Sequence, residues 1–168
     1  MALFQPTALF RGAEYITPEY LRGHGICALI LDVDNTLTAH GSQELPPDVA
    51  AWLDTMRAAG VKLTIASNNM PGRVAPFAKR VGLEYQAFCC KPSPFGLRRA
   101  RRAMGVSRRE VALVGDQIFT DVLGANCAGV QSILISAIHN HTIWLKLRHV
   151  AELPFIAIGK WRIRHEKH

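Results

Sequence analysis

The sequence predicts an α/β fold, in which a doubly wound parallel sheet carries helices on both faces. Short apolar runs alternate with segments whose apolar residues recur at helical spacing, from about residue 26 to residue 136. Strands separated by helix-length segments imply right-handed crossovers and a parallel sheet covered on both sides. Polar clusters also follow several of the apolar runs, which is where ligands bind in sheets of this kind.

The expected strands are short, apolar and bounded by polar or turn-forming residues. Ile26–Leu31 is a continuous apolar run between Gly25 and Asp32, as expected for a strand that is buried on both faces. Further runs predict the other strands, at residues 61–66, 85–89, 111–114 and 132–136. The segment before residue 26 is expected to be irregular or partly helical.

The expected helices lie between these strands and have recognisable start and stop residues. Pro46-Pro47-Asp48 opens a segment with apolar residues at helical spacing, and Gly60 ends it. Gly82 ends the next helix in the same way. Helical spacing predicts helices within residues 46–60, 74–82, 93–104 and 120–128.

Length and composition favour one soluble globular domain. The chain has 168 residues, enough for one substantial core, so we predict a single domain over residues 1–168 with its core at about 26–136. Apolar residues make up 49% of the chain and charged residues 20%, which is ordinary for globular proteins. The sequence lacks an apolar run of the ~18 residues that a membrane-spanning helix needs, and residues 1–10 lack a secretion-signal pattern. A cytoplasmic location is expected.

The cysteines and a histidine pair are given structural interpretations. Because adjacent cysteines such as Cys89 and Cys90 can be bridged only with severe strain, we expect reduced thiols. Cys27 and Cys127 lie in apolar segments and are expected in the core. His139-Asn140-His141 is expected to form a polar loop, since a zinc site needs further ligands that the spacing does not supply.

Polar clusters stand at the ends of predicted strands, or one short loop beyond them. They are Asp32 with Asp34, then Ser67, then Lys91, and finally Asp116 with Asp121. Taken singly, each has an ordinary explanation, because aspartates and serines form turns and helix caps and lysines are usually solvated. Since parallel strands end at one edge of a sheet, the fold would gather all of them in one crevice. The combination therefore favours a catalytic site.

This set contains the groups that phosphoryl transfer requires. The reaction needs a nucleophile in line with the leaving oxygen, cations against the phosphate oxygens and a proton donor. Asp32 can act as the nucleophile if Mg²⁺ and Lys91 offset the charge repulsion. Asp34 can protonate the leaving alcohol and later deprotonate water. Asp116 and Asp121 offer the hard oxygen ligands that Mg²⁺ prefers.

The clusters resemble, in order, the four motifs of the haloacid dehalogenase (HAD) superfamily. The matching text is Asp32-x-Asp34-x-Thr36, Ser67 after the second strand, Lys91, and Gly115-Asp116-x-x-x-x-Asp121. This resemblance covers residues from about 26 to 136 and implies a Rossmann-like domain that uses Mg²⁺. The implied roles are Asp32 as nucleophile, Asp34 as acid/base, Ser67, Asn68 and Lys91 as phosphate binders, and Asp32, Asp34 (through its backbone) and Asp116 as metal ligands, supported by Asp121.

The fuller motifs give a finer resemblance. Asp-Val-Asp-Asn-Thr-Leu, Ser-Asn-Asn, Lys-Pro and Gly-Asp-Gln-Ile-Phe-Thr-Asp-Val look like the YqeG branch of the capless subclass III. That branch is similar to the mitochondrial phosphatidylglycerophosphate phosphatases, which act on a lipid headgroup. The resemblance implies a phosphatase of phosphate monoesters, with phosphatidylglycerophosphate as the favoured substrate and phospholipid metabolism as its setting. Four further polar residues are expected to shape the crevice, without assigned roles: Asn35, Asn69, Gln117 and Thr120.

The spacing of the motifs leaves no room for a cap domain over the crevice. Only Thr38–Pro46 separates the first motif from the next helix, and a helix and a strand occupy most of residues 68–90. An open crevice suits a phosphate on something large, such as a lipid, a protein or a nucleic-acid end. It also suits a small molecule whose lid comes from another subunit.

Two basic regions bear on the choice of partner. Arginines crowd the helix at residues 93–104 and its exit, and a basic, aromatic region spans residues 142–168. Aromatic and basic residues together can bind an anionic membrane surface peripherally, although this region can equally pack its apolar residues on the domain. The net charge of +7 favours phosphorylated metabolites, RNA or acidic lipids without choosing among them.

Two non-enzymatic classes compete with the phosphatase hypothesis. A binding protein for RNA or another partner would use the basic surfaces, but it has no need of Asp32, Asp34, Lys91 and Asp116 together. A phosphoacceptor signalling domain also combines aspartate with Mg²⁺, but the acid/base group Asp34 would make its acyl phosphate short-lived. A phosphatase is the leading hypothesis. The sequence leaves its substrate open among lipid, soluble and macromolecular phosphates, and it gives no oligomeric state.

Overall fold

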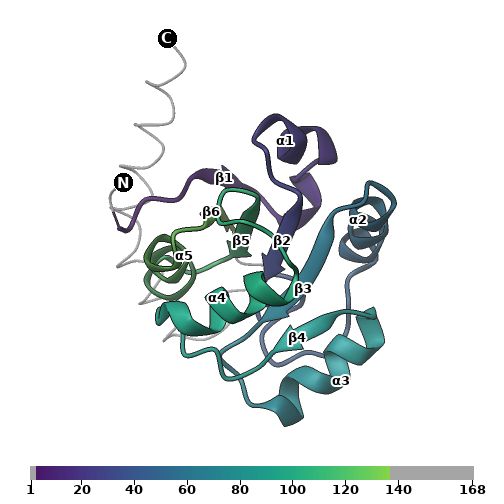
Figure 1. Ribbon diagram of the computed structural model, residues 1–168. Coiled ribbons are helices and arrows are strands. Elements are labelled where there is room, and N and C mark those ends of the chain that lie inside the picture. Colours follow the sequence, from purple (N-terminus) through teal and green to yellow (C-terminus); the bar gives the residue numbers. More distant parts are fainter. Residues whose placement is uncertain (1–2, 137–168) are drawn as a thin grey trace.

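The computed structural model describes residues 3–136, which form one parallel sheet between two layers of helices (Figure 1). The strands are β1 (Ala8–Phe10), β2 (Ala28–Leu31), β3 (Lys62–Ala66), β4 (Glu84–Gln86), β5 (Val111–Gly115) and β6 (Gln131–Ile135). Their order across the sheet is β1-β6-β5-β2-β3-β4, and every neighbouring pair is parallel. The predicted doubly wound α/β class is confirmed.

The helices begin and end close to the positions that the sequence signals. They are the 3-10 helix η1 (Ala13–Tyr15), α1 (Pro18–Gly23), α2 (Pro47–Ala58), α3 (Pro71–Val81), α4 (Pro94–Ala103), the π-helical turn η2 (Ile118–Val122) and α5 (Leu123–Ala128). Helices α2, α3 and α4 each start at a proline, whose fixed φ and missing N–H suit the first turn. Helix α3 ends at Gly82, which takes the left-handed conformation with φ of 64°.

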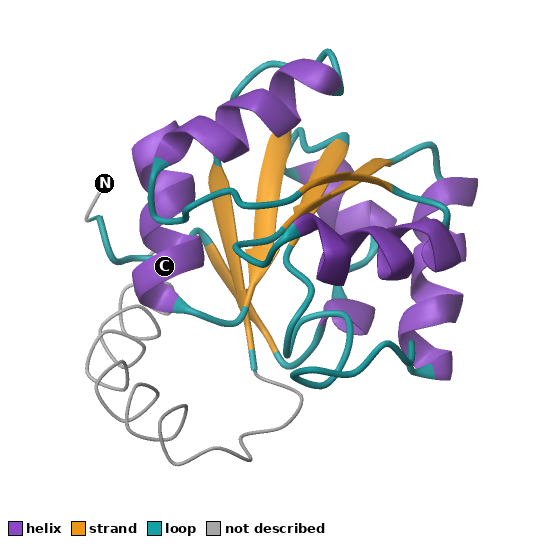
Figure 2. Cartoon of the chain, turned by 90° about the horizontal axis from the view of Figure 1, so that it is seen from below, coloured by secondary structure: helices purple, strands orange, loops and turns teal. Residues whose placement is uncertain are grey.

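Strand β2 shows how the sheet is buried on both faces. Its side chains alternate, so that Leu29 and Leu31 join the core beneath α2, α3 and the N-terminal helices, whereas Ala28 and Ile30 join the core beneath α4 and α5. Figure 2 shows the sheet from below, with helices on either side of it. This central, fully buried strand carries Asp32 at its carboxyl end.

The N-terminal segment contains a strand that the sequence did not predict. Strand β1 adds to the edge of the sheet, where Ala8 pairs with Ile133 of β6. Thr7 and Ser132 exchange backbone-to-hydroxyl hydrogen bonds of 3.1 and 3.2 Å beside this pairing. Three residues are too few for the period of a strand to be visible in sequence.

The cysteine prediction was wrong for Cys27 and Cys127, which are both exposed. Cys27 directly precedes β2, and unlike its buried neighbours Ile26 and Ala28 its side chain faces solvent. Cys127 lies on the outer side of α5, while Ala125 and Ala128 face the sheet. Cys89 is buried, and all the cysteines are free thiols.

The sheet is built so that its switch point lies between β2 and β5. The chain runs from β2 outward to β3 and β4, then returns to β5 on the opposite side of β2. Within residues 3–136, the 32–46 segment connects β2 to α2 without any inserted domain, and only α3, β4 and α4 lie between β3 and β5. The carboxyl ends of β2 and β5 are therefore not covered by a cap within the described chain.

Two predictions made from the sequence concern residues outside 3–136. The basic, aromatic region 142–168 and the segment His139-Asn140-His141 lie outside the described residues. Among residues 3–136, none of the helices has the length and apolar character needed to cross a bilayer.

Candidate active site

The predicted acids and Lys91 come together at the switch point of the sheet. Asp32 and Asp34 follow β2, Ser67 follows β3, and Asp116 follows β5. All the predicted charged and hydroxyl-bearing site residues are buried polar groups in a protein whose other buried residues are mostly apolar: Asp32, Asp34, Ser67, Lys91, Asp116 and Asp121. Buried charges persist in proteins only when they are paired, hydrogen-bonded or bound to a ligand.

Lys91 links the first and fourth motifs. Its Nζ donates to Asp32 Oδ1 at 2.6 Å and to Asp121 Oδ1 at 2.7 Å, and only 2% of its side chain is exposed. Burial by itself would lower the pKa of Lys91, but the carboxylates of Asp121 and Asp32 more than offset this and raise it. Lys91 is therefore a fixed positive charge beside Asp32.

Asp32 lies in an environment that opposes its ionisation when no divalent cation is bound. Burial raises the pKa of Asp32 to about 7, against the lowering effect of Lys91 and with further raising effects from Asp121 and Asp34. An additional positive charge in this crevice would favour the ionised form of Asp32.

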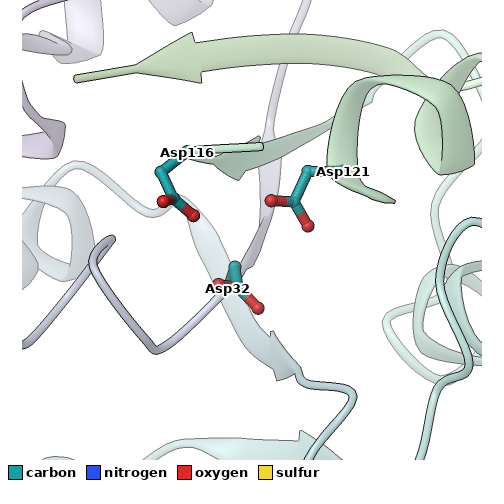
Figure 3. A group of neighbouring side chains, drawn as sticks. All are labelled: Asp32, Asp116 and Asp121. Carbon is teal, nitrogen blue, oxygen red and sulfur yellow. The ribbon is translucent and has the colours of Figure 1, made fainter. Parts of the chain in front are cut away.

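A group of three carboxylates offers a place for that charge. Oxygen atoms of Asp32, Asp116 and Asp121 all lie within 4.8 Å of one another, and all three residues are buried. Figure 3 shows their carboxylates turned toward a common space, with Asp32 and Asp116 coming from strand ends and Asp121 from η2. Hard oxygen ligands on a net negative cluster fit Mg²⁺ well.

Asp121 is held in place by a π-helical turn and by a glycine. Its backbone N–H donates to Gln117 O at 2.9 Å, and its Oδ2 accepts from Gln117 N at 3.1 Å. A Cβ on Gly115 would lie 2.4 Å from Asp121 Cγ, far inside contact distance. Single π-helical turns often occur at functional sites, and this one aims Asp121 at Lys91.

Asp34 has different neighbours from Asp32, although only one residue separates them. Its Oδ1 accepts from Gly41 N at 3.0 Å and from Arg73 Nη2 at 2.9 Å. Its Oδ2 accepts from Asn69 Nδ2 at 2.5 Å. His40 Nδ1 lies 3.8 Å from Oδ1. In this arrangement both oxygens of Asp34 are acceptors. Asp34 is as buried as Asp32, but its partners Gly41, Asn69 and Arg73 are more exposed than Lys91 and Asp121, so we call this the open side of the crevice.

A tight turn after β2 brings the two acids to the same crevice. The carbonyl of Val33 accepts from the backbone N–H groups of Thr36, Leu37 and Thr38 at 3.0–3.3 Å. Asn35 takes a left-handed φ of 61°, which asparagine tolerates better than most residues. The crevice thus begins immediately where the buried strand ends.

The segment after β3 supports both acids through neighbouring asparagines. The Asn68 carboxamide donates to Lys91 O at 2.9 Å and accepts from Lys91 N at 2.6 Å, so it holds the backbone of the lysine. The phosphate contact of Asn68 stays a prediction, because its carboxamide has two N–H donors and only one of them is used here. Ser67 Oγ accepts from Asn69 N at 3.1 Å and keeps its own hydroxyl proton for donation.

Sequence reasoning missed one residue of this site altogether. Arg73 lies in the first turn of α3 and reaches Asp34 across the 39–44 segment, where it also donates to Ser42 O at 2.9 Å. Asn69 was expected near the crevice without a role, and the structure places it on Asp34. A lone arginine at a helix start carries no spacing signal, so only the folded chain shows this contact.

Comparisons with known proteins agree with the motifs. The family model for haloacid dehalogenase-like hydrolases matches residues 38–129. The chain is 34% identical over 132 residues to "Probable phosphatase YqeG" of Bacillus subtilis, spanning 79% of this chain and 77% of that protein. It is 22% identical over 165 residues to "Phosphatidylglycerophosphate phosphatase 1, chloroplastic/mitochondrial" of Arabidopsis thaliana, which covers 93% of this chain but only 47% of that protein.

A solved structure supports the fold alone. NagD from Escherichia coli K-12 superposes with a TM-score of 0.55 at 15% identity, covering 68% of this chain and 90% of NagD. The family model begins after Asp32 and Asp34, so the structure supplies the placement of the first motif beside the other three. With more than half of the chain matched, and with a relative above 30% identity over most of both lengths, this chain belongs to the haloacid dehalogenase-like hydrolases.

Proposed function

We propose that the protein is a magnesium-dependent phosphatase that hydrolyses a phosphate monoester through a phosphoaspartyl intermediate on Asp32. The observation that carries this proposal is the buried contact of Asp32 with Lys91, beside the carboxylates of Asp116 and Asp121. A nucleophile, a fixed cation and a set of oxygen ligands for Mg²⁺ thus occupy one crevice. The matched family and the phosphatase names of its relatives support the same reaction class.

The chemistry follows from the contacts of the two acids. Asp32 attacks phosphorus, the bond from phosphorus to the alcohol oxygen breaks, and Asp34 gives that oxygen a proton. Asp34 then takes a proton from water, whose oxygen attacks phosphorus and releases phosphate and free Asp32. Lys91 and the Ser67 hydroxyl stabilise the phosphoryl oxygens. Asp32, Asp116 and Asp121, with the backbone of Asp34, would hold Mg²⁺, which offsets negative charge when bound.

The mechanism is tested by removing the nucleophile and the metal separately. Asp32→Asn should abolish hydrolysis of 4-nitrophenyl phosphate, and so should chelation of Mg²⁺, with recovery when Mg²⁺ is restored. Trapping with a phosphate donor and mass spectrometry should show one added phosphoryl group on the wild-type protein and none on the variant. Full activity after both changes would refute the mechanism.

We further propose that the substrate is a phosphorylated lipid headgroup, with phosphatidylglycerophosphate as the favoured compound. The relative from Arabidopsis thaliana carries that substrate in its name. Met70, Phe88 and Phe95 are exposed by 63%, 63% and 75%, which is unusual for large apolar side chains. Phe88 N donates to the carbonyl of Asn69 at 2.9 Å, which places Phe88 beside the Asn69–Met70 segment, whose Asn69 side chain contacts Asp34.

The neighbouring helix adds charge to this apolar surface. Gly96 packs against Cys89, so the start of α4, which carries Phe95, lies beside the segment that carries Phe88. Farther along α4, Arg99 and Arg102 are exposed, and neither α3 nor α4 contains an acidic residue. Apolar and cationic side chains beside an open crevice suit a peripheral contact with an anionic membrane.

Two measurements test the lipid proposal. A phosphatase screen should favour phosphatidylglycerophosphate over sugar, nucleotide and peptide phosphates, and a preference for soluble monoesters would remove the claim. Sedimentation with anionic vesicles should fall when Met70, Phe88 and Phe95 are all replaced by serine. Replacement of Leu3 and Tyr15, which are exposed by 53% and 55%, is the matched control and should leave sedimentation unchanged.

A further inference from the structure

Arg73 contacts Asp34, the proposed general acid, although the proposed reaction does not require this contact. Its Nη2 lies 2.9 Å from Asp34 Oδ1, and 25% of its side chain is exposed. Gly41 N already donates to Asp34 Oδ1, and Asn69 Nδ2 already donates to Oδ2. Each oxygen of Asp34 therefore has an orienting donor without Arg73. The arginine is surplus for fixing the carboxylate.

The guanidinium of Arg73 keeps unused donors on an anchored side chain. Arginine has five N–H groups, and both contacts to described residues run through Nη2, one to Asp34 Oδ1 and one to Ser42 O. Among residues 3–136, no acceptor contacts its Nη1 or Nε groups. Both groups are accessible to solvent rather than buried without a partner. The backbone nearby is also tied down, because Gln43 Nε2 donates to Arg73 O at 3.1 Å.

The place of these donors is defined by the chemistry of Asp34. A general acid must come within about 3 Å of the leaving oxygen that it protonates. Since Arg73 Nη2 lies 2.9 Å from Asp34, the leaving oxygen must bind within roughly 6 Å of the guanidinium. The atoms that directly follow this oxygen in the alcohol are therefore within reach of Nη1 and Nε. In the proposed reaction the phosphoryl group would bind on the other side of the leaving oxygen, against Asp32 and Lys91.

On this basis we propose that Arg73 is a specificity-determining residue that binds a second negative charge, carried by the leaving alcohol close to the ester oxygen. The inference rests on the proposed phosphatase function and narrows its substrate class. The preferred substrates are phosphate monoesters whose alcohol bears a phosphodiester or a carboxylate. The planar guanidinium suits both groups, because it can offer two parallel N–H donors to paired oxygens.

The test compares alcohols of similar size that differ in charge. Activity is measured with Mg²⁺ on three substrates. The alcohol of glycerol 3-phosphate is neutral, that of 3-phosphoglycerate bears a carboxylate, and that of short-chain phosphatidylglycerophosphate bears a phosphodiester. The wild-type protein should favour at least one anionic alcohol in kcat/KM by on the order of 10-fold, the usual effect of a charge-assisted hydrogen bond. The anionic substrate with the higher kcat/KM identifies which charged group, the carboxylate or the phosphodiester, Arg73 binds.

Substitution of Arg73 should remove this preference selectively. Arg73→Gln should bring the ratio of anionic to neutral kcat/KM close to one, mainly through KM, and Arg73→Lys should retain part of it. The matched control is Arg80→Gln on the same helix, because Arg80 also ties the same segment to α3, through Gln43 O at 2.9 Å, without contacting Asp34. This control should keep the ratio. An equal loss on all three substrates would show that Arg73 only positions Asp34 and would overturn the inference.

A binding measurement separates this inference from the proposed reaction. In an Asp32→Asn background, calorimetry should show that 3-phosphoglycerate or the short-chain lipid binds on the order of 10-fold more tightly than glycerol 3-phosphate. Arg73→Gln in the same background should abolish the difference. Equal affinities with Arg73 present would refute the role of Arg73 whether or not the protein turns over phosphates. Absence of turnover together with selective anion binding would refute only the proposed reaction.

Discussion

Asp32 and Asp34 are separated by one residue, yet each belongs to a different half of the crevice. Asp32 lies on the buried side with Lys91 and the carboxylates of Asp116 and Asp121. Asp34 lies on the open side, where its partners are donors from the backbone, from Asn69 and from Arg73. The tight turn after β2 thus sorts two identical side chains into two electrostatic environments. Divergent environments of this kind commonly separate the roles of paired carboxylates.

The largest expected effect is a loss of activity that depends on the leaving group of the substrate for Asp34 but not for Asp32. Asp32→Asn should remove activity on glycerol 3-phosphate and on 4-nitrophenyl phosphate alike, because both need the nucleophile. Asp34→Asn should slow glycerol 3-phosphate by roughly 10²–10⁴-fold, but 4-nitrophenyl phosphate much less, because nitrophenolate leaves without a proton. Steady-state kcat on both substrates checks this. Equal losses for Asp34→Asn would contradict its role as the general acid.

A smaller effect is expected when the buried side is disturbed without removing a charge. In Gly115→Ala the new Cβ would lie 2.4 Å from Asp121 Cγ, so the Asp121 carboxylate must shift from the position in which it contacts Lys91. We expect a loss of about 10–100-fold in kcat, since misplacement by about 1 Å has such consequences. Gly72→Ala is the matched control, because nothing lies within 4 Å of its Cβ position. Unchanged kinetics in Gly115→Ala would show that Asp121 is not needed on Lys91.

These two halves were not equally predictable from the sequence. On the buried side, Asp32, Lys91 and Asp116 follow strands or short loops beyond them, and parallel strands necessarily end at one edge. Their convergence could therefore be inferred from order alone. On the open side, Arg73 reaches Asp34 from a helix across another segment. Such a contact depends on how α3 packs, which has no signature in residue spacing.

The same distinction explains smaller differences between prediction and structure. The class of fold followed from the alternation of apolar runs, but three-residue strand β1 has too little pattern to be seen. Apolar neighbours suggested that Cys127 is buried, yet only the face of α5 that carries Ala125 and Ala128 meets the sheet. The residues next to a helical position in the sequence do not decide whether its side chain is buried. Burial depends on which face of the helix the side chain occupies.

The pH dependence of the stability of the metal-free protein should show how unfavourable the ionised form of Asp32 is on the buried side of the crevice. The pKa of Asp32 is raised to about 7 from an ordinary value near 3.8, so the folded protein holds this proton more tightly than the unfolded chain. Its stabilising effect is complete below about pH 4 and is lost as the pH rises through 7. Relative to wild type, Asp32→Asn should therefore gain on the order of 2 kcal/mol in free energy of unfolding between pH 5 and pH 8.

Urea unfolding in the presence of a chelator measures this difference. Saturating Mg²⁺ at pH 8 should stabilise wild type more than Asp32→Asn, because the variant has lost one of the carboxylates of the group. A difference between the two proteins that is the same at both pH values would show that Asp32 is not the group that titrates.

The adjacent asparagines provide the smallest and most specific comparison, because each serves one half of the crevice. Asn68 holds the backbone of Lys91 through two hydrogen bonds, whereas Asn69 donates to Asp34 Oδ2. Alanine at Asn68 should therefore reduce kcat on glycerol 3-phosphate and 4-nitrophenyl phosphate by a similar factor of about 3–10, the usual worth of a neutral hydrogen bond. Alanine at Asn69 should affect glycerol 3-phosphate more, since only that substrate depends on the proton from Asp34. If both variants changed the two substrates in the same proportion, the two halves would act as one unit, and the separation of Asp32 from Asp34 would have no kinetic consequence.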